Sequence, residues 1–275
     1  MADIMEFKGK IGLKDDIKAL REELVKLVEE RDNLIYTVCP NIKMRYMVKV
    51  GYLEYKLYEL NLKYQRLKRK KELIQAKVYR SEKVILIDIE ELLDKEFEEY
   101  KKELEEKLHE LNASIKRSEG KFLSEVESED LKDMYRKVVK KLHPDLNPNL
   151  TEAEKELFVR AVEAYKAGDV ASMKLIYVVS GADEETKDDD TKLKTVLDMA
   201  EEKARLEKLI ENIKNNMDEI KSCFPYTLKI YLDDVELRRK KKKELEDSIN
   251  NYNLAINDLE EAIAKLLEEK DEWFS

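Results

Sequence analysis

His143, Pro144 and Asp145 are the residues of this chain whose types most clearly suggest chemistry. An imidazole titrates near neutral pH, so a histidine beside a carboxylate could in principle serve as an acid–base pair. The same residues could instead only end a helix, because the helix dipole favours a histidine near a helix C-terminus and proline cannot continue a helix. Taken alone, the tripeptide favours this second interpretation.

A basic, amphipathic helix is predicted directly before the tripeptide, over residues 128–142. Its apolar stripe consists of Leu131, Met134, Tyr135, Val138 and Leu142. Its remaining face carries Lys132, Arg136, Lys137, Lys140 and Lys141. Such a cluster could steer an encounter with an acidic partner, or it could be no more than the solvated face of an amphipathic helix.

Another helix is predicted to begin near Thr151, because Glu154 three residues later completes the pattern of a capping box. The side of this helix that faces the core would carry Phe158, Ala161, Val162 and Tyr165. A further short helix follows Gly168. We expect Tyr135 and Tyr165 to be core residues that hold the first two helices together.

Together these segments resemble the J-domain family, the module that recruits DnaK-type chaperones. The matching residues are Tyr135-Arg136-Lys137, Lys141-Leu142-His143-Pro144-Asp145, Asn147-Pro148, Phe158 and Glu163-Ala164-Tyr165. The match covers roughly residues 128–168, less than a fifth of the chain. It implies a J-like helical core of Leu131, Tyr135, Val138, Leu142, Phe158, Ala161 and Tyr165.

The resemblance implies a co-chaperone or adaptor that engages a DnaK-type chaperone. The basic residues Lys132, Arg136, Lys137, Lys140 and Lys141 would meet an acidic surface on the chaperone's nucleotide-binding domain. His143, Pro144 and Asp145 would contact the chaperone near its interdomain linker and promote ATP hydrolysis. In the alternative, the chain is a structural or interaction protein whose J-like fold does not activate a chaperone.

Several features of the family are absent from this sequence. The Gly/Phe-rich region, the Cys-rich zinc module and the basic segment of the family's fourth helix are missing. The short first helix and its Leu-Gly turn are not obvious either. We expect the end of the preceding long helix, around Leu111 and Ile115, to replace that first helix, with Phe122 and Leu123 filling the core.

The composition predicts long helices in the rest of the chain. Its 275 residues include only six Gly and four Pro, while 42% of the residues are charged. Average globular chains contain about 7% Gly, about 5% Pro and about 25% charged residues. Few helix breakers and many charges predict an all-α protein that contains coiled coils.

Antiparallel coiled-coil hairpins are expected on both sides of the central module. Heptad stripes run through residues 13–38 and 42–78, and Pro40 between them is expected to end one helix and turn the chain. Pro225 holds a matching place near the C-terminus, which reflects either an ancient duplication or two uses of proline to turn a hairpin. The predicted order is a hairpin (1–80), a long helix (81–120), the J-like module (121–182), an acidic linker (183–190) and a second hairpin (191–275).

A second basic patch consists of Arg238, Arg239, Lys240, Lys241, Lys242 and Lys243. It could bind nucleic acid or an acidic surface, although no aromatic residues are interleaved to stack on bases. The heptad seam falls on Arg238 and Lys242, so we expect these residues to pair with acidic residues of the preceding helix. The net charge of −9 also argues against a general nucleic-acid binder.

Catalysis is not expected, because the sequence contains no metal-ligand cluster, no Gly-rich phosphate loop and no Ser or Cys nucleophile with a partner. We therefore predict no catalytic residues, no metal and no cofactor. Two cysteines, Cys39 and Cys223, are typical of a reducing compartment. With no run of about 20 apolar residues and no signal peptide over residues 1–10, the expected location is the cytoplasm. The coiled coils would bind a client or partner and could form oligomers.

Overall fold

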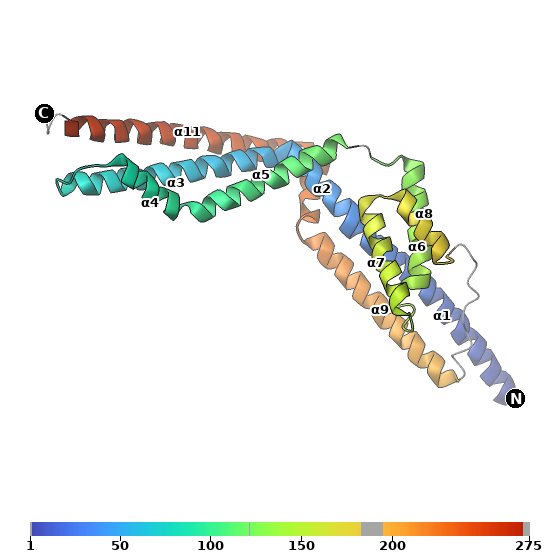
Figure 1. The fold of residues 1–275 in the computed structure, drawn as a ribbon. Coiled ribbons are helices and arrows are strands. Elements are labelled where there is room, and N and C mark those ends of the chain that lie inside the picture. Colours follow the sequence, from blue (N-terminus) through green and yellow to red (C-terminus); the bar gives the residue numbers. More distant parts are fainter. Residues whose placement is uncertain (1, 121, 183–194, 272–275) are drawn as a thin grey trace. The chain divides into compact units, whose positions relative to one another are not determined.

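The computed structural model describes residues 2–120, 122–182 and 195–271. These residues form helices joined by turns and loops, and no strand occurs among them (Figure 1). The predicted all-α class is therefore confirmed. The predicted acidic linker at 183–190 lies outside the described residues.

The chain divides into two compact units, each assembled from two separate stretches of sequence. Unit 1 contains Met1–Asn41 and Lys121–Thr227, and unit 2 contains Ile42–Gly120 and Leu228–Ser275. Neither of the predicted hairpins, at 1–80 and 191–275, corresponds to one of these units. Helices from the beginning and the end of the sequence are instead combined in each unit.

The residues around Pro40 are helical rather than a turn. The first elements are α1 (Ala2–Asn33), the π-helical segment η1 (Leu34–Val38), α2 (Cys39–Tyr46), the π-helical segment η2 (Met47–Gly51) and α3 (Tyr52–Tyr79). Pro40 is the second residue of α2, so the prediction that it ends a helix and turns the chain was wrong. The amide of Cys39 bonds to the carbonyl of Leu34, five residues earlier, and this wider turn precedes the proline. Proline has no amide donor and its ring crowds the preceding turn, and a wider π-helical turn before it gives room for the ring within a continuing helix.

In unit 1, α1 pairs with α9 (Val196–Ser222). The two helices run in the same direction, because Asp16 pairs with Lys203 and Glu23 pairs with Lys214, each at 2.7 Å. Their apolar stripes contribute Leu24, Val28, Leu206, Ile210 and Ile213 to the core. The antiparallel hairpin predicted over residues 1–80 was therefore wrong, and α1 instead forms a parallel pair.

The central module of unit 1 consists of α6 (Glu125–Leu142), α7 (Glu152–Ala167) and α8 (Val170–Val179), which pack against one another (Figure 1). Capping boxes begin two of these helices, at Ser124 with Glu127 and at Thr151 with Glu154. Helix α1 also packs on α6. It takes the place that was predicted for the end of the long helix around Leu111.

The residues before α6 were predicted to fill the core of the module. Leu123 packs against the core of unit 1, but Phe122 is exposed. The prediction for Phe122 was therefore wrong. Leu111 and Ile115 lie on α5 (Glu98–Glu119), which belongs to unit 2.

Unit 2 is built around α3. Helix α11 (Val235–Asp271) runs parallel to it, with Lys241 near Glu54 at 3.8 Å and Glu260 paired with Lys63 at 2.8 Å. The predicted hairpin over residues 191–275 was wrong, because α9 and α11 pack on different partners. Between them lie the short elements η4 (Tyr226–Leu228) and α10 (Lys229–Asp233).

Helices α4 (Leu86–Glu96) and α5 return along α3 in the opposite direction. Lys70 pairs with Glu90 at 2.6 Å, whereas the earlier Arg66 pairs with the later Asp94 at 2.9 Å. The single long helix predicted over 81–120 is interrupted at Phe97. A small core of Ile74, Ile89, Leu93 and Ile263 joins α3, α4 and α11.

Within the described ranges, none of the helices combines the length and the apolar character that crossing a membrane requires.

Candidate functional site

His143 ends α6 and lies inside the module. Its amide bonds to the carbonyl of Val139 at 3.0 Å, and only 7% of the residue is exposed. The rings of His143 and Phe158 pack edge to face, with centroids 5.2 Å apart and an interplanar angle of 75°. The imidazole is therefore packed as part of the core rather than presented to solvent.

The buried imidazole accepts a hydrogen bond from the loop. The backbone N–H of Asp145 donates to Nδ1 of His143 at 3.1 Å, which requires Nδ1 to be unprotonated. Burial lowers the pKa of His143, and the nearby charge of Asp145 opposes this effect only in part. The neutral ring is therefore the form that the folded loop favours. The carboxylate of Asp145 lies 3.9 Å from Nδ1, beyond hydrogen-bonding distance.

The loop after His143 is fixed by further backbone bonds. The carbonyl of His143 accepts from the amides of Leu146 at 3.1 Å and Asn147 at 2.9 Å. The side chain of Asn147 also donates to the carbonyl of Lys140 at 3.0 Å. Pro144 is exposed, and the side chain of Asp145 is 49% exposed. One ordered loop thus presents a proline ring and a carboxylate to solvent.

Two tyrosines hold α6 and α7 together. The rings of Tyr135 and Tyr165 are stacked, with centroids 4.2 Å apart. The hydroxyl of Tyr135 donates to the carboxylate of Asp32 on α1 at 2.6 Å, and burial raises the pKa of Tyr135. The structure buries Leu131, Tyr135, Val138, Leu142, Ala161 and Tyr165, and it leaves Phe158 half-buried against the same core.

The five basic residues of α6 have different surroundings. Arg136 bonds to Glu29 of α1 at 2.9 Å, and Lys141 bonds to the carbonyl of Gly181 at 2.7 Å. Lys137 and Lys140 are exposed, and Lys132 is half-buried. Lys137 lies beside Tyr177 of α8, with its Nζ 3.3 Å from the tyrosine hydroxyl. The predicted basic face is therefore divided between internal contacts and solvent.

Three residues outside the predicted module contribute to the site. Glu29 and Asp32 of α1 contact α6, and Arg205 of α9 donates to the carbonyl of Asp145 at 2.9 Å. For the contacts of Glu29 and Asp32, the sequence offered one signal, which is that both acidic residues lie beside the apolar stripe of α1. It did not indicate which helix would supply the partners.

The basic run at 238–243 lies in unit 2 and is largely engaged there. Arg238 donates to the carbonyls of Tyr231 at 3.1 Å and Leu232 at 3.0 Å. Arg239 pairs with Glu236 at 2.8 Å, Lys241 lies 3.8 Å from Glu54 and Lys242 lies over the ring of Tyr52. Arg238 thus bonds to backbone carbonyls and Lys242 contacts an aromatic ring of α3, so the predicted pairing of these two residues with acidic residues of the preceding helix was wrong. Lys240 and Lys243 are exposed.

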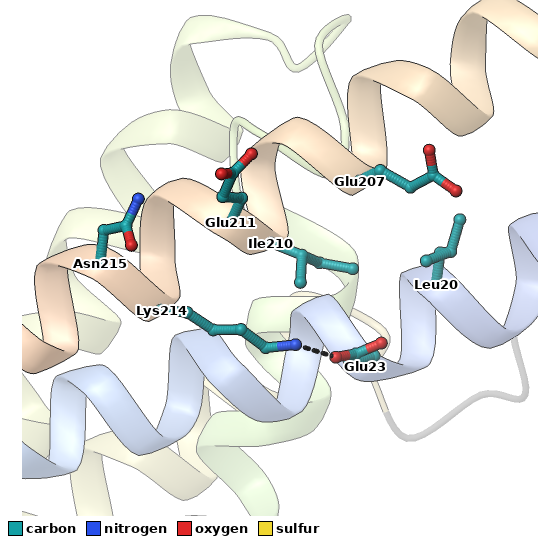
Figure 2. A pocket seen from close by; sticks show the side chains of 7 residues that line it. All are labelled: Leu20, Glu23, Glu207, Ile210, Glu211, Lys214 and Asn215. Atoms are coloured by element: carbon teal, nitrogen blue, oxygen red, sulfur yellow. Dashed lines mark hydrogen bonds and ion pairs between the residues drawn. The ribbon is translucent and has the colours of Figure 1, made fainter.

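A shallow groove of about 450 Å³ lies between α1 and α9. Its lining consists of Leu20, Glu23, Glu207, Ile210, Glu211, Lys214 and Asn215. Figure 2 shows Glu23 and Lys214 reaching across it to form their ion pair. None of the residues predicted for chaperone binding lines this groove. In the parts of the chain that the structure describes, no group of three or more His, Cys, Asp or Glu side chains could hold a metal ion.

Comparisons with protein-family models, curated proteins and solved structures gave no match to this chain. The fold defines an all-α class of protein. Helices α1 and α9 form a parallel pair, and the module of α6, α7 and α8 lies between them in the sequence. The loop after His143 is ordered by hydrogen bonds to both the ring and the carbonyl of His143.

Proposed function

We propose that this chain is a J-domain-like co-chaperone or adaptor that engages a DnaK-type chaperone through α6 and the loop at His143. The loop carries the proposal: buried His143 holds the amide of Asp145, while Pro144 and the Asp145 carboxylate remain exposed. Because the loop is already ordered, docking costs little conformational entropy. An exposed carboxylate on a fixed loop is suited to recognition by a basic group of the partner.

The exposed lysines of α6 support the same proposal. Lys137 and Lys140 are three residues apart, so they lie on the same side of the helix. They would provide a positive surface for an acidic region of the chaperone and speed the encounter at low salt. The parallel pairs α1–α9 and α3–α11 would hold a client or partner. Engagement of such a chaperone would take place in the cytoplasm.

The test is single-turnover ATP hydrolysis by DnaK-type chaperones, measured with the full chain and with Asp145→Asn. The substitution removes the charge of an exposed side chain and nearly preserves its shape. We expect the unmodified chain to stimulate hydrolysis and the variant to lose about tenfold in stimulation or in affinity. Glu156→Gln, which neutralises an exposed carboxylate on α7, is the matched control and should behave as the unmodified chain. No stimulation of any tested chaperone by the unmodified chain would contradict the proposal.

A purely structural role is the alternative, and the bond between Arg136 and Glu29 favours it. That bond commits one residue of the basic face to a contact with α1. In this case the chain would bind its partners, but ATP hydrolysis would not respond to it or to any loop variant. His143→Gln adds a second comparison because it alters the loop from within the core, and circular dichroism would verify that the helices remain.

A further inference from the structure

Arg205 of α9 reaches the loop from a distant part of the sequence. Its Nη1 donates to the carbonyl of Asp145 at 2.9 Å, across a separation of 60 residues. Its other nitrogens are held by Glu202, with Nε–Oε2 at 2.7 Å and Nη2–Oε1 at 3.0 Å. The guanidinium is therefore oriented by two hydrogen bonds before it contacts the loop.

Glu202 is itself anchored on the other side. Arg21 of α1 donates to its Oε1 at 3.3 Å, and the Glu202 side chain is only 15% exposed. Burial acts to raise the pKa of Glu202, but the bonds from Arg205 and Arg21 outweigh it, so the pKa is lowered and the carboxylate stays ionised. Helices α1 and α9 thus supply a fixed chain of contacts that ends at the loop.

The contact holds Asp145 without covering it. Arg205 binds the backbone carbonyl of this residue, and His143 binds its backbone amide. Asp145 is consequently held at both of its peptide groups, while its carboxylate remains half-exposed beside exposed Pro144. Fixing both peptide groups restricts the directions in which the carboxylate can point.

We propose that Arg205 is a positioning residue of the chaperone-docking loop, so that the docking site is assembled from two segments 60 residues apart. This inference rests on the proposed function for its consequence, but the positioning itself can be measured in the protein alone. Arg205 sets the orientation of Asp145 and makes α9 a structural part of the site.

The experiment compares Arg205→Ala, Arg205→Lys and the control Arg160→Ala, which removes an exposed arginine from α7. Hydrogen exchange of the Asp145, Leu146 and Asn147 amides is measured in the full chain at fixed pH, with the amides of α7 as an internal reference. We expect Arg205→Ala to speed exchange of the loop amides about tenfold, because a hydrogen bond from a charged donor is lost. The α7 amides should be unchanged. Lysine retains the charge but not the planar fork, so partial rescue is expected, and Arg160→Ala should have no effect.

The same variants are then compared in the ATP-hydrolysis assay. A larger chain concentration for half-maximal stimulation with Arg205→Ala, at an unchanged maximal rate, would support a positioning role. Loop amides that exchange at the same rate in Arg205→Ala and in the unmodified chain would overturn it. Stronger stimulation by Arg205→Ala would overturn it as well, because the contact would then restrain docking. If the unmodified chain fails to stimulate hydrolysis, the proposed function fails, and amide exchange still decides whether Arg205 positions the loop.

Discussion

In unit 1 two carboxylates of α1 are buried, whereas in unit 2 the ion pairs between α3 and α4 lie at the surface. Asp32 is 2% exposed and bonds to Arg31 and Tyr135, and Glu29 is also buried and bonds to Arg136. A buried charge is tolerated only when hydrogen bonds and an opposite charge compensate for lost hydration.

The pairs of unit 2 have different surroundings. Arg69 bonds to Glu96 at 2.9 and 3.1 Å, with both side chains partly exposed, and Asp94 is shared by Arg66 and Lys101. Exposed pairs contribute little because water and salt screen them. We therefore expect unit 1 to be sensitive to substitutions at its buried ion pairs and unit 2 to tolerate substitutions at its exposed ones.

The largest effect is expected for Tyr135→Ala. This residue is fully buried, stacks on Tyr165 and supplies a hydrogen bond to Asp32. The free energy of unfolding of unit 1 should fall by about 3–5 kcal/mol. Hydrogen exchange of the α6 and α7 amides measures the free energy of unfolding of unit 1 separately from that of unit 2. Tyr79→Ala, at a residue that is 91% exposed in unit 2, is the control, and similar losses for both substitutions would break the comparison.

A smaller effect is expected for Arg136→Gln. Its loss leaves Glu29 buried without its charged partner, which should cost unit 1 about 1–3 kcal/mol. The double variant Arg136→Gln with Glu29→Gln should recover part of this loss, because both charges are then removed. Urea unfolding with residue-resolved hydrogen exchange gives the free energies of unfolding of the unmodified chain, the two single variants and the double variant. Strictly additive losses would show that the pair is not coupled, and Lys140→Gln is a control at an exposed position of the same helix.

The smallest effect is expected for Arg69→Ala. Removing its bonds to Glu96 should change the free energy of unfolding of unit 2 by less than about 1 kcal/mol. At about 1 M salt, where the screening length is about 3 Å, even that difference should disappear. The loss from Arg136→Gln should persist under the same conditions, since Glu29 is buried. A salt-independent loss for Arg69→Ala would contradict the distinction between the two units.

Helix positions could be predicted from the sequence because their signals are local. The capping box at Thr151 and Glu154 and the apolar stripe of α6 depend only on neighbouring residues. Partner choice could not be predicted, since α1, α3, α9 and α11 carry similar stripes and any of them could pair with another. The short connection at Pro40 favoured a hairpin, but the wider turn that precedes the proline allows the helix to continue.

In the candidate site, too, local features could be predicted from the sequence and contacts between distant segments could not. Spacing identified His143, Pro144 and Asp145 and most of the buried residues around them. The sequence did not indicate the roles of Glu29 and Arg205, because each acts on a helix or loop far from it along the chain. The role of Glu29 depends on the packing of α1 against α6, and the role of Arg205 depends on the position of α9 beside the loop.

The parallel pairs also determine when the core of each unit can be completed during synthesis. Arg21 of α1 meets Glu202 across 181 residues, and Asn61 of α3 meets Tyr252 across 191 residues. At about 5–20 residues per second, a ribosome needs roughly 10 to 40 seconds to make such an interval. During that time α1 can pack only on the module of α6, and α3 only on α4 and α5, because α9 and α11 have not yet been made. We therefore expect neither unit to complete its core before α9 and α11 have been made.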